Sequence, residues 1–124
     1  DIVPYLLATA NGTLDKCDAP AWDKRQCVGV VMCAEGYPGL YRKGEPILGI
    51  SSANANEDVV VFQAGTRQDG PQLLTNGGRV LAVTAMGKNV AEAREAAYAG
   101  VEKIRWNGAF WRSDIGLRPA TLSN

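Results

Sequence analysis

The 124-residue sequence contains no histidine. Histidine is the usual general base near neutral pH and the usual partner of a nucleophilic serine or cysteine. Its absence excludes a histidine-based triad, and it leaves no ligand pattern for zinc. Catalysis by this chain alone would need a carboxylate, lysine or thiolate with a shifted pKa. We therefore expect binding rather than catalysis, and we assign no catalytic and no metal-ligating residue.

The sequence also lacks an excess of charge and has few cysteines. Thirteen basic and thirteen acidic residues cancel, which argues against non-specific binding to nucleic acid or to an anionic membrane. The spacing of Cys17, Cys27 and Cys33 suggests no metal site, and we expect reduced thiols that are buried as small hydrophobic residues. No apolar run approaches the roughly 20 residues that cross a bilayer. These features predict a cytoplasmic protein without a nucleic-acid or membrane partner.

The clearest structural signal runs from residue 77 to residue 105. Gly77-Gly78 is expected to turn the backbone at positive φ, and the apolar run that follows predicts a strand over 79–85. Asn89 and Glu92 then predict an N-cap with a capping box, which begins a helix over 89–105. The apolar face of this helix is formed by Val90, Ala93, Ala97, Val101 and Ile104.

The N-terminal third combines a helix, a connection and a strand. We expect a helix over 1–10, ended by Asn11-Gly12, whose apolar side docks on a part of a longer protein that is absent here. Residues 13–26 are polar and predict a surface connection in which Trp22 packs against the domain. The run over 27–34 is apolar throughout and predicts a strand that is buried on both faces.

Turn residues separate the remaining strands. A loop rich in glycine and proline covers 35–46, and Asp69-Gly70-Pro71 predicts the turn of a hairpin. The predicted strands occupy residues 47–50, 59–64, 73–74 and 109–112. Short strands joined by turns indicate an α+β fold, in which a mostly antiparallel sheet packs against one long helix and the N-terminal helix is peripheral. We expect one domain over 1–116, with residues 1–12 docking on the missing part, and a flexible tail over 117–124.

Arg79 is the first candidate for binding a ligand. Its guanidinium can bind a phosphate or carboxylate with two hydrogen bonds, and the bare backbone of Gly77 and Gly78 allows close approach of a ligand. A salt bridge from Arg79 to Glu92 or Asp114 is the structural alternative.

The loop over 35–46 carries a second group of candidates. Arg42 and Lys43 would add positive charge beside Arg79 if the loop folds toward it, and Tyr37 and Tyr41 accompany them. The alternative is a solvated turn whose tyrosines pack at its rim.

Two stretches carry a family resemblance. The sequences of residues 36–44, Gly-Tyr-Pro-Gly-Leu-Tyr-Arg-Lys-Gly, and of residues 77–85, Gly-Gly-Arg-Val-Leu-Ala-Val-Thr-Ala, resemble the C-terminal domain of phosphoribosylamine-glycine ligase, or glycinamide ribonucleotide synthetase, of the ATP-grasp superfamily. The resemblance extends from Asp1 to about Gly116. It includes the alanine-rich helix and the closing Arg112-Ser113-Asp114-Ile115-Gly116.

The resemblance implies a ligase of purine biosynthesis. In that family, glycine is joined to 5-phosphoribosylamine while ATP is converted to ADP and phosphate. ATP and Mg²⁺ or Mn²⁺ bind to upstream ATP-grasp domains that are absent here, so we expect no cofactor in this chain. The C-terminal domain closes the substrate end of the cleft. By analogy, Arg79 is the first candidate for the 5-phosphate and Lys43 the second.

By the same resemblance, Arg42 is a further residue for the phosphate and supports the pocket. Tyr37, Tyr41, Gly77 and Gly78 are expected to shape it. Two other classes stay open: a free-standing module that binds a phosphorylated metabolite or assembles with a partner, and a purely structural domain. An upstream ATP-grasp region in the gene would favour the ligase.

Overall fold

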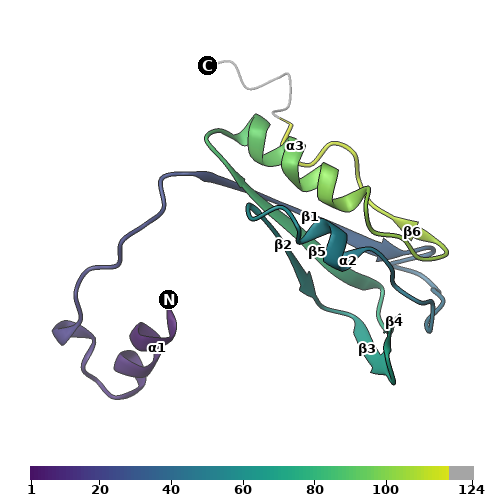
Figure 1. Ribbon diagram of the computed structural model, residues 1–124. Coiled ribbons are helices and arrows are strands. Elements are labelled where there is room, and N and C mark those ends of the chain that lie inside the picture. Colours follow the sequence, from purple (N-terminus) through teal and green to yellow (C-terminus); the bar gives the residue numbers. More distant parts are fainter. Residues whose placement is uncertain (118–124) are drawn as a thin grey trace.

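The computed structural model describes residues 1–117, and its centre is a four-stranded antiparallel sheet. The strand order is β2 (Val59–Gln63), β5 (Arg79–Gly87), β1 (Gln26–Ala34) and β6 (Ala109–Phe110). The helix α3 (Val90–Val101) covers one face of this sheet (Figure 1). The hairpin of β3 (Thr66–Asp69) and β4 (Gln72–Thr75) extends from it. The predicted α+β fold with a mostly antiparallel sheet is confirmed.

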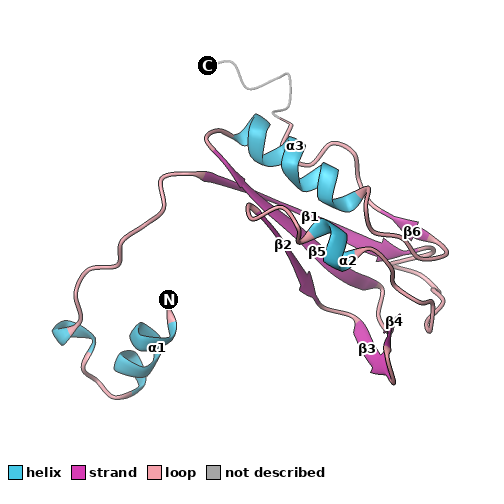
Figure 2. Cartoon of the chain, viewed as in Figure 1, coloured by secondary structure: helices cyan, strands magenta, loops and turns pink. Residues whose placement is uncertain are grey.

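The N-terminal segment lies apart from the sheet. It contains α1 (Val3–Ala10) and a 3-10 helix (Leu14–Lys16), and an extended connection leads from there to β1 (Figure 2). The helix α1 is on the opposite side of the sheet from α3 (Figure 1). As predicted, the helix ends before Gly12, which has φ of +64°. No described helix is long and apolar enough to cross a membrane.

The core lies between α3 and the inner face of the sheet. Because side chains of a strand alternate between its two faces, Val30 and Met32 of β1 point toward α3 and are fully buried. The intervening Val31 is 43% exposed, and Cys27 is exposed as well. The prediction that β1 is buried on both faces is therefore wrong within residues 1–117. The strand β5 contributes Leu81 and Val83 to the core, and α3 contributes Ala93, Ala97 and Val101.

The start of α3 confirms the predicted cap, and its end corrects the predicted length. Asn89 Oδ1 accepts a hydrogen bond from the backbone N–H of Glu92 at 2.9 Å. The Glu92 carboxylate in turn accepts from the backbone N–H of Lys88 at 3.2 Å. The helix ends at Val101, so the predicted end at Arg105 is wrong. Arg105 is instead extended, because its backbone pairs with Leu48 in an isolated β-bridge.

The predicted strand over 47–50 is also wrong. Leu48 forms only the bridge to Arg105, and the short helix α2 (Ile50–Ala53) begins directly after Gly49. Gly49 has φ of +91°, and the carbonyl oxygen of Lys103 occupies the place where a Cβ would lie. This close approach turns the chain out of an extended conformation.

Several smaller predictions differ from the structure. The strand β5 continues through Gly87, and β6 is limited to two residues. Trp22 is 80% exposed, so its predicted packing is not found among the described residues. The three cysteines are free thiols, but they are partly or fully exposed rather than buried. Except for Leu117, the predicted tail over 117–124 lies outside the described residues.

Candidate functional site

The loop over 35–46 meets the start of β5 through an aromatic ring packed on a glycine. A Cβ built on Gly78 would lie 2.8 Å from Cε2 of Tyr37 and 3.0 Å from its Cγ. A Cβ on Gly77 would lie 2.9 Å from Cα of Gly65. Neither Gly77 nor Gly78 has positive φ, so the predicted reason for the double glycine is wrong. Both glycines are explained by close packing with other parts of this chain.

Arg79 is the residue after Gly78, and it lines a hollow on the sheet face opposite α3. The hollow has a volume of about 430 Å³, and we call it the Arg79 hollow. Its wall includes Cys33, Tyr37, Pro38, Phe110, Trp111 and Arg112. Arg79 is exposed and stands opposite Cys33 at an irregularity in the pairing of β1 and β5. Arg79 is therefore a cation at the edge of a largely apolar hollow, and Arg112, the other arginine of the wall, is paired with Asp114.

The predicted alternative partners of Arg79 are engaged elsewhere. Glu92 caps α3, and Asp114 accepts a hydrogen bond from Arg112 Nη2 at 2.6 Å. No salt bridge of Arg79 is found among residues 1–117. Burial raises the pKa of the Cys33 thiol, while the nearby Arg79 guanidinium opposes that rise. Cys33 is thus a neutral thiol near pH 7, and the charge of Arg79 stays available for an anion.

Arg42 lies in a separate hollow. This second hollow has a volume of about 500 Å³, and Glu35, Glu45 and Trp106 line it together with Tyr41 and Arg42. The two carboxylates oppose the binding of an anion there. Arg42 and Arg79 are therefore not brought together in one hollow.

Two tyrosines connect the hollows. The ring centroids of Tyr37 and Tyr41 are 6.2 Å apart, with the rings tilted by 60°. Lys43 Nζ is 5.9 Å from the centroid of the Tyr41 ring, within reach of a cation–π interaction. Tyr37 thus lines the Arg79 hollow, and Tyr41, which is near Lys43, lines the other one.

Two residues of α3 fix the wall of the Arg79 hollow, and sequence reasoning missed both. Arg94 donates from Nε to the carbonyl of Ile115 at 3.0 Å and from Nη2 to that of Ser113 at 2.6 Å. The Tyr98 hydroxyl donates to the carbonyl of Arg112 and accepts from the backbone N–H of Ile115. Arg94 also lies over the Tyr98 ring. Their spacing of four residues on one helix face was the available signal.

Within residues 1–117, no group of three or more cysteine, aspartate or glutamate side chains is arranged to hold a metal ion. The chemistry that this geometry supports is recognition of an anion by Arg79.

Comparison with known proteins agrees with the motifs around this site. The family model for the phosphoribosylglycinamide synthetase C domain matches residues 27–118. The chain belongs to this family. The matched region contains both motif stretches and the closing segment, so the resemblance seen in the sequence is confirmed.

Longer relatives match almost the whole chain. A phosphoribosylamine–glycine ligase of Allochromatium vinosum is 52% identical over 118 residues, which are 95% of this chain and 27% of that protein. One of Pseudomonas aeruginosa is 54% identical over 117 residues, with 94% and 27% covered. The crystal structure of the Thermotoga maritima enzyme aligns with a TM-score of 0.74 at 33% identity and covers 91% of this chain. This chain therefore spans about a quarter of the length of these relatives.

Proposed function

We propose that this chain is the substrate-side C-terminal domain of a phosphoribosylamine-glycine ligase in the purine pathway. The observation that carries the proposal is the match along 95% of the chain to proteins with this name, which are about three and a half times as long. The full-length polypeptide joins glycine to 5-phosphoribosylamine in the cytoplasm and converts ATP to ADP and phosphate. The 124-residue chain alone is inert.

The reaction needs positioning more than a general base. The glycine carboxylate takes the terminal phosphoryl group of ATP to form an acyl phosphate. The amine of phosphoribosylamine then attacks the glycyl carbonyl carbon, and phosphate leaves. Such a sequence depends on orientation and on electrostatic stabilisation, which agrees with a domain that offers an arginine and contains no histidine.

The nucleotide and its metal belong to the remaining domains in this proposal. Residues 1–117 hold no cluster of ligands that fits Mg²⁺ or Mn²⁺. The divalent ion, when bound elsewhere in the polypeptide, supplies charge neutralisation for the phosphates. This domain contributes the wall that faces 5-phosphoribosylamine.

Arg79 is the residue that we propose to bind the 5-phosphate. Its guanidinium has no salt-bridge partner among the described residues, it is exposed, and it lines a hollow. Arg42 is a weaker candidate because Glu35 and Glu45 share its hollow. Lys43 is the second candidate, and its Nζ lies near the ring of Tyr41, which lines the second hollow. A guanidinium binds phosphate with two charge-assisted hydrogen bonds, which favours Arg79 over Lys43.

The function is tested by product formation. The full-length polypeptide encoded by the gene and the 124-residue chain are each supplied with glycine, ATP, Mg²⁺ and phosphoribosylamine. Glycinamide ribonucleotide and ADP are then measured by mass spectrometry. We expect both products only from the full-length polypeptide and only when both substrates are present. A gene without an upstream ATP-grasp region, or a full-length polypeptide that makes neither product, would instead support a free-standing binding module.

A further inference from the structure

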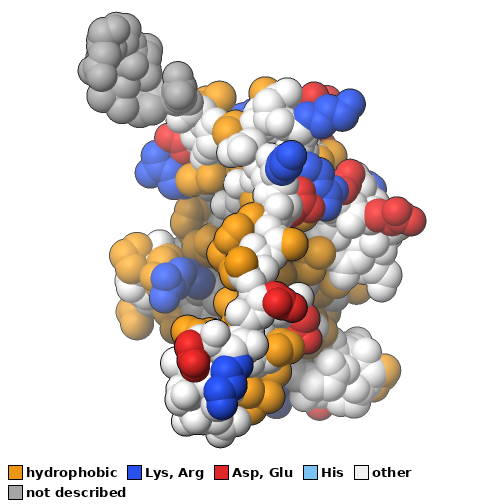
Figure 3. All heavy atoms as spheres, turned by 90° about the vertical axis from the view of Figure 1, so that its left-hand side faces the viewer, with side chains coloured by type: hydrophobic (Ala, Val, Ile, Leu, Met, Phe, Trp, Pro, Cys, Tyr) orange, Lys and Arg blue, Asp and Glu red, His pale blue; other side chains and the backbone are white. Residues whose placement is uncertain are grey.

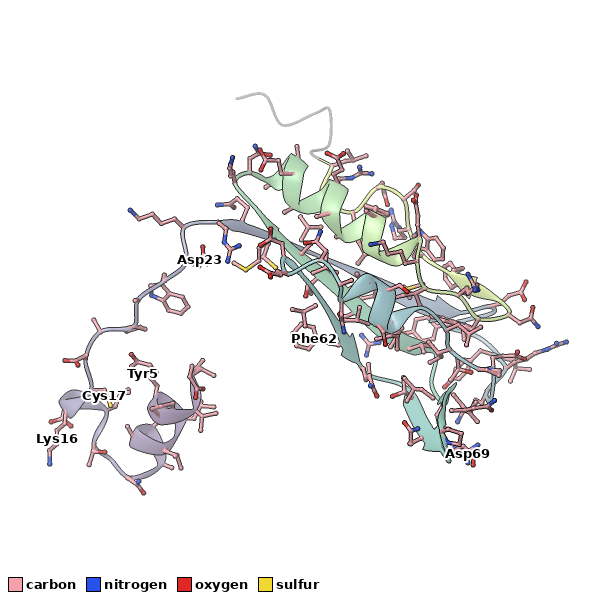
Figure 4. All side chains as sticks on the ribbon, viewed as in Figure 1. Tyr5, Lys16, Cys17, Asp23, Phe62 and Asp69 are labelled. Carbon is pink, nitrogen blue, oxygen red and sulfur yellow. The ribbon has the colours of Figure 1, made fainter. Side chains whose placement is uncertain are left out.

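Three segments that are far apart in the sequence meet at the second hollow. They are the turn after β1, the loop over 35–46 and the segment after α3, and they come together at the end of the sheet where β1 ends (Figure 1). The N-terminal segment, which carries Tyr5 and Cys17, lies well away from this end of β1 (Figure 4). The fold therefore builds a hollow of about 500 Å³ at one end of the molecule.

Two glutamates of this hollow are fixed at the backbone by distant parts of the chain. The N–H of Glu35 donates to the carbonyl of Gly108 at 2.8 Å, and a Cβ on Gly108 would lie 3.3 Å from Oε2 of Glu35. The N–H of Glu45 donates to Oγ1 of Thr75 at 3.1 Å, and Thr75 is fully buried in β4. Both carboxylates are therefore presented from held positions rather than from a free loop.

Arg42 lines the same hollow, and its charge is not neutralised by these acids. Within residues 1–117, neither Arg42 nor Glu35 nor Glu45 belongs to a salt bridge. Charges of opposite sign thus border one hollow without pairing. Because each of them remains free, the hollow offers both signs of charge to a ligand.

The chemistry of the second hollow differs from that of the surface on the α1 side. There, hydrophobic side chains reach the surface over much of the middle of the molecule (Figure 3). The second hollow instead combines the three charged side chains with Asn107 and with the rings of Tyr41 and Trp106. A few convergent polar groups beside aromatic rings are typical of a site for a small molecule.

The ring of Trp106 provides an independent indication. It is 8% exposed, and its indole N–H is buried without a hydrogen-bond partner within residues 1–117. A buried donor of this kind lowers stability unless an acceptor reaches it. Trp106 borders the second hollow, so this is where an acceptor from outside the chain can approach the ring.

The pattern of charge restricts the class of ligand. The two carboxylates oppose a simple anion, and the guanidinium of Arg42 opposes a metal ion or a simple cation. A ligand with an ammonium group and a carboxylate satisfies both signs. The ammonium group can donate to carboxylates and lie over an aromatic ring, and the carboxylate can accept two hydrogen bonds from a guanidinium.

We propose that the second hollow binds a free α-amino acid, with its ammonium group at Glu35 and Glu45 and its carboxylate at Arg42. The inference goes beyond the proposed function, and it gives Arg42 a ligand other than the 5-phosphate. The volume of the hollow leaves room for a side chain. The ligand class is therefore defined by the two charged groups that all free amino acids share.

Fluorine NMR of the full-length polypeptide tests the site. The polypeptide is labelled with fluorotryptophan, and Trp106→Phe identifies the resonance of Trp106. Glycine, the amino acid without a side chain, is then added in the absence of ATP. We expect a saturable shift of the Trp106 resonance, while Trp22, which is 80% exposed, and Trp111, which lines the Arg79 hollow, respond little. A Trp106 resonance that glycine does not move would overturn the proposal.

Two analogues of glycine test the need for both charges. Glycinamide lacks the carboxylate, and N-acetylglycine lacks the ammonium group. Each should need at least roughly tenfold more ligand for half-saturation, because each loses charge-assisted hydrogen bonds. An analogue that binds as tightly as glycine would contradict recognition of a zwitterion.

Substitutions show whether the response arises at the second hollow. Glu45→Gln and Arg42→Gln remove one charge each and should raise the half-saturating glycine concentration by a similar factor. Glu102→Gln and Arg105→Gln are the matched controls, because they change exposed residues that do not line the hollow. Equal effects of the two pairs of variants would refute binding at this place.

The outcomes for the site and for the proposed function are separable. If the full-length polypeptide makes glycinamide ribonucleotide but the Trp106 resonance is insensitive to glycine, the amino-acid site fails and the function stands. If the resonance responds as expected but no product forms, the function fails and the amino-acid site stands.

Discussion

The aromatic ring of Tyr37 lies against the backbone of Gly78, at the place where a side chain would begin. Replacing Gly78 by alanine forces the ring, or the start of β5, to move. Overpacking of this kind costs about 1–3 kcal/mol of the free energy of unfolding. Urea denaturation of the purified chain should show this loss for Gly78→Ala.

A double-mutant cycle identifies the Tyr37 ring as the cause. Tyr37→Ala removes the ring, so Gly78→Ala should cost less in that background than in the natural sequence. The same cost in both backgrounds would show that the contact between Tyr37 and Gly78 does not limit residue size at position 78.

The hydroxyl of Tyr98 holds the segment that closes the Arg79 hollow. Tyr98→Phe removes its bonds to the backbone of Arg112 and Ile115 and should lower the free energy of unfolding by about 1–2 kcal/mol. Tyr5→Phe is the control, because the Tyr5 hydroxyl makes no side-chain hydrogen bond within residues 1–117. Equal effects of the two substitutions in urea denaturation would contradict the role of Tyr98.

A small ion-pair network joins the connection before β1 to the turn before β2. Arg25 binds Asp23 at 2.8 Å and Asp58 at 2.6 Å. Its side-chain hydrogen bond to Asp23 lowers the pKa of that carboxyl from the ordinary 3.8 to about 2. Because the folded-state pKa is depressed, the contribution of this pair to stability is present above pH 3.8 and is lost as the pH falls toward 2.

Carboxyl carbon NMR measures this directly. The midpoint of Asp23 should lie near pH 2 and should rise toward 3.8 in Arg25→Ala. Arg112→Ala is the control: it should raise the pKa of Asp114, which Arg112 lowers by a hydrogen bond, and should leave Asp23 unchanged. A midpoint of Asp23 that does not respond to Arg25→Ala would refute the network.

Local signals predicted the parts of the fold that local interactions determine. The Asn89 cap and the Asp69-Gly70 turn act within a few residues, and both are present in the structure. The strand over 47–50 was predicted wrongly because the conformation of Gly49 depends on the carbonyl of Lys103, which is distant in the sequence. Side chains on both faces of β1 are apolar, as the sequence shows. The sequence does not show that α3 covers only one of these faces, so the predicted burial of the other face is wrong.

The candidate site shows the same division. The exposure of Arg79 after two glycines could be anticipated from the sequence, whereas the packing of Tyr37 on Gly78 joins residues far apart in the chain. The separation of Arg42 from Arg79 depends on the path of the loop over 35–46, which local propensity does not determine. The guanidinium of Arg94 donates to two carbonyls of the closing segment, which are far from it in the sequence, so local pattern does not reveal this contact.

Steady-state kinetics of Arg79→Ala in the full-length polypeptide tests the central claim most directly. Loss of a charge-assisted contact of roughly 1.5–3 kcal/mol should raise the KM for phosphoribosylamine roughly tenfold to hundredfold. The KM for ATP should change little, and Arg42→Ala should have the smaller effect on phosphoribosylamine. A KM for phosphoribosylamine that is unchanged by Arg79→Ala would contradict the assignment of the 5-phosphate to Arg79.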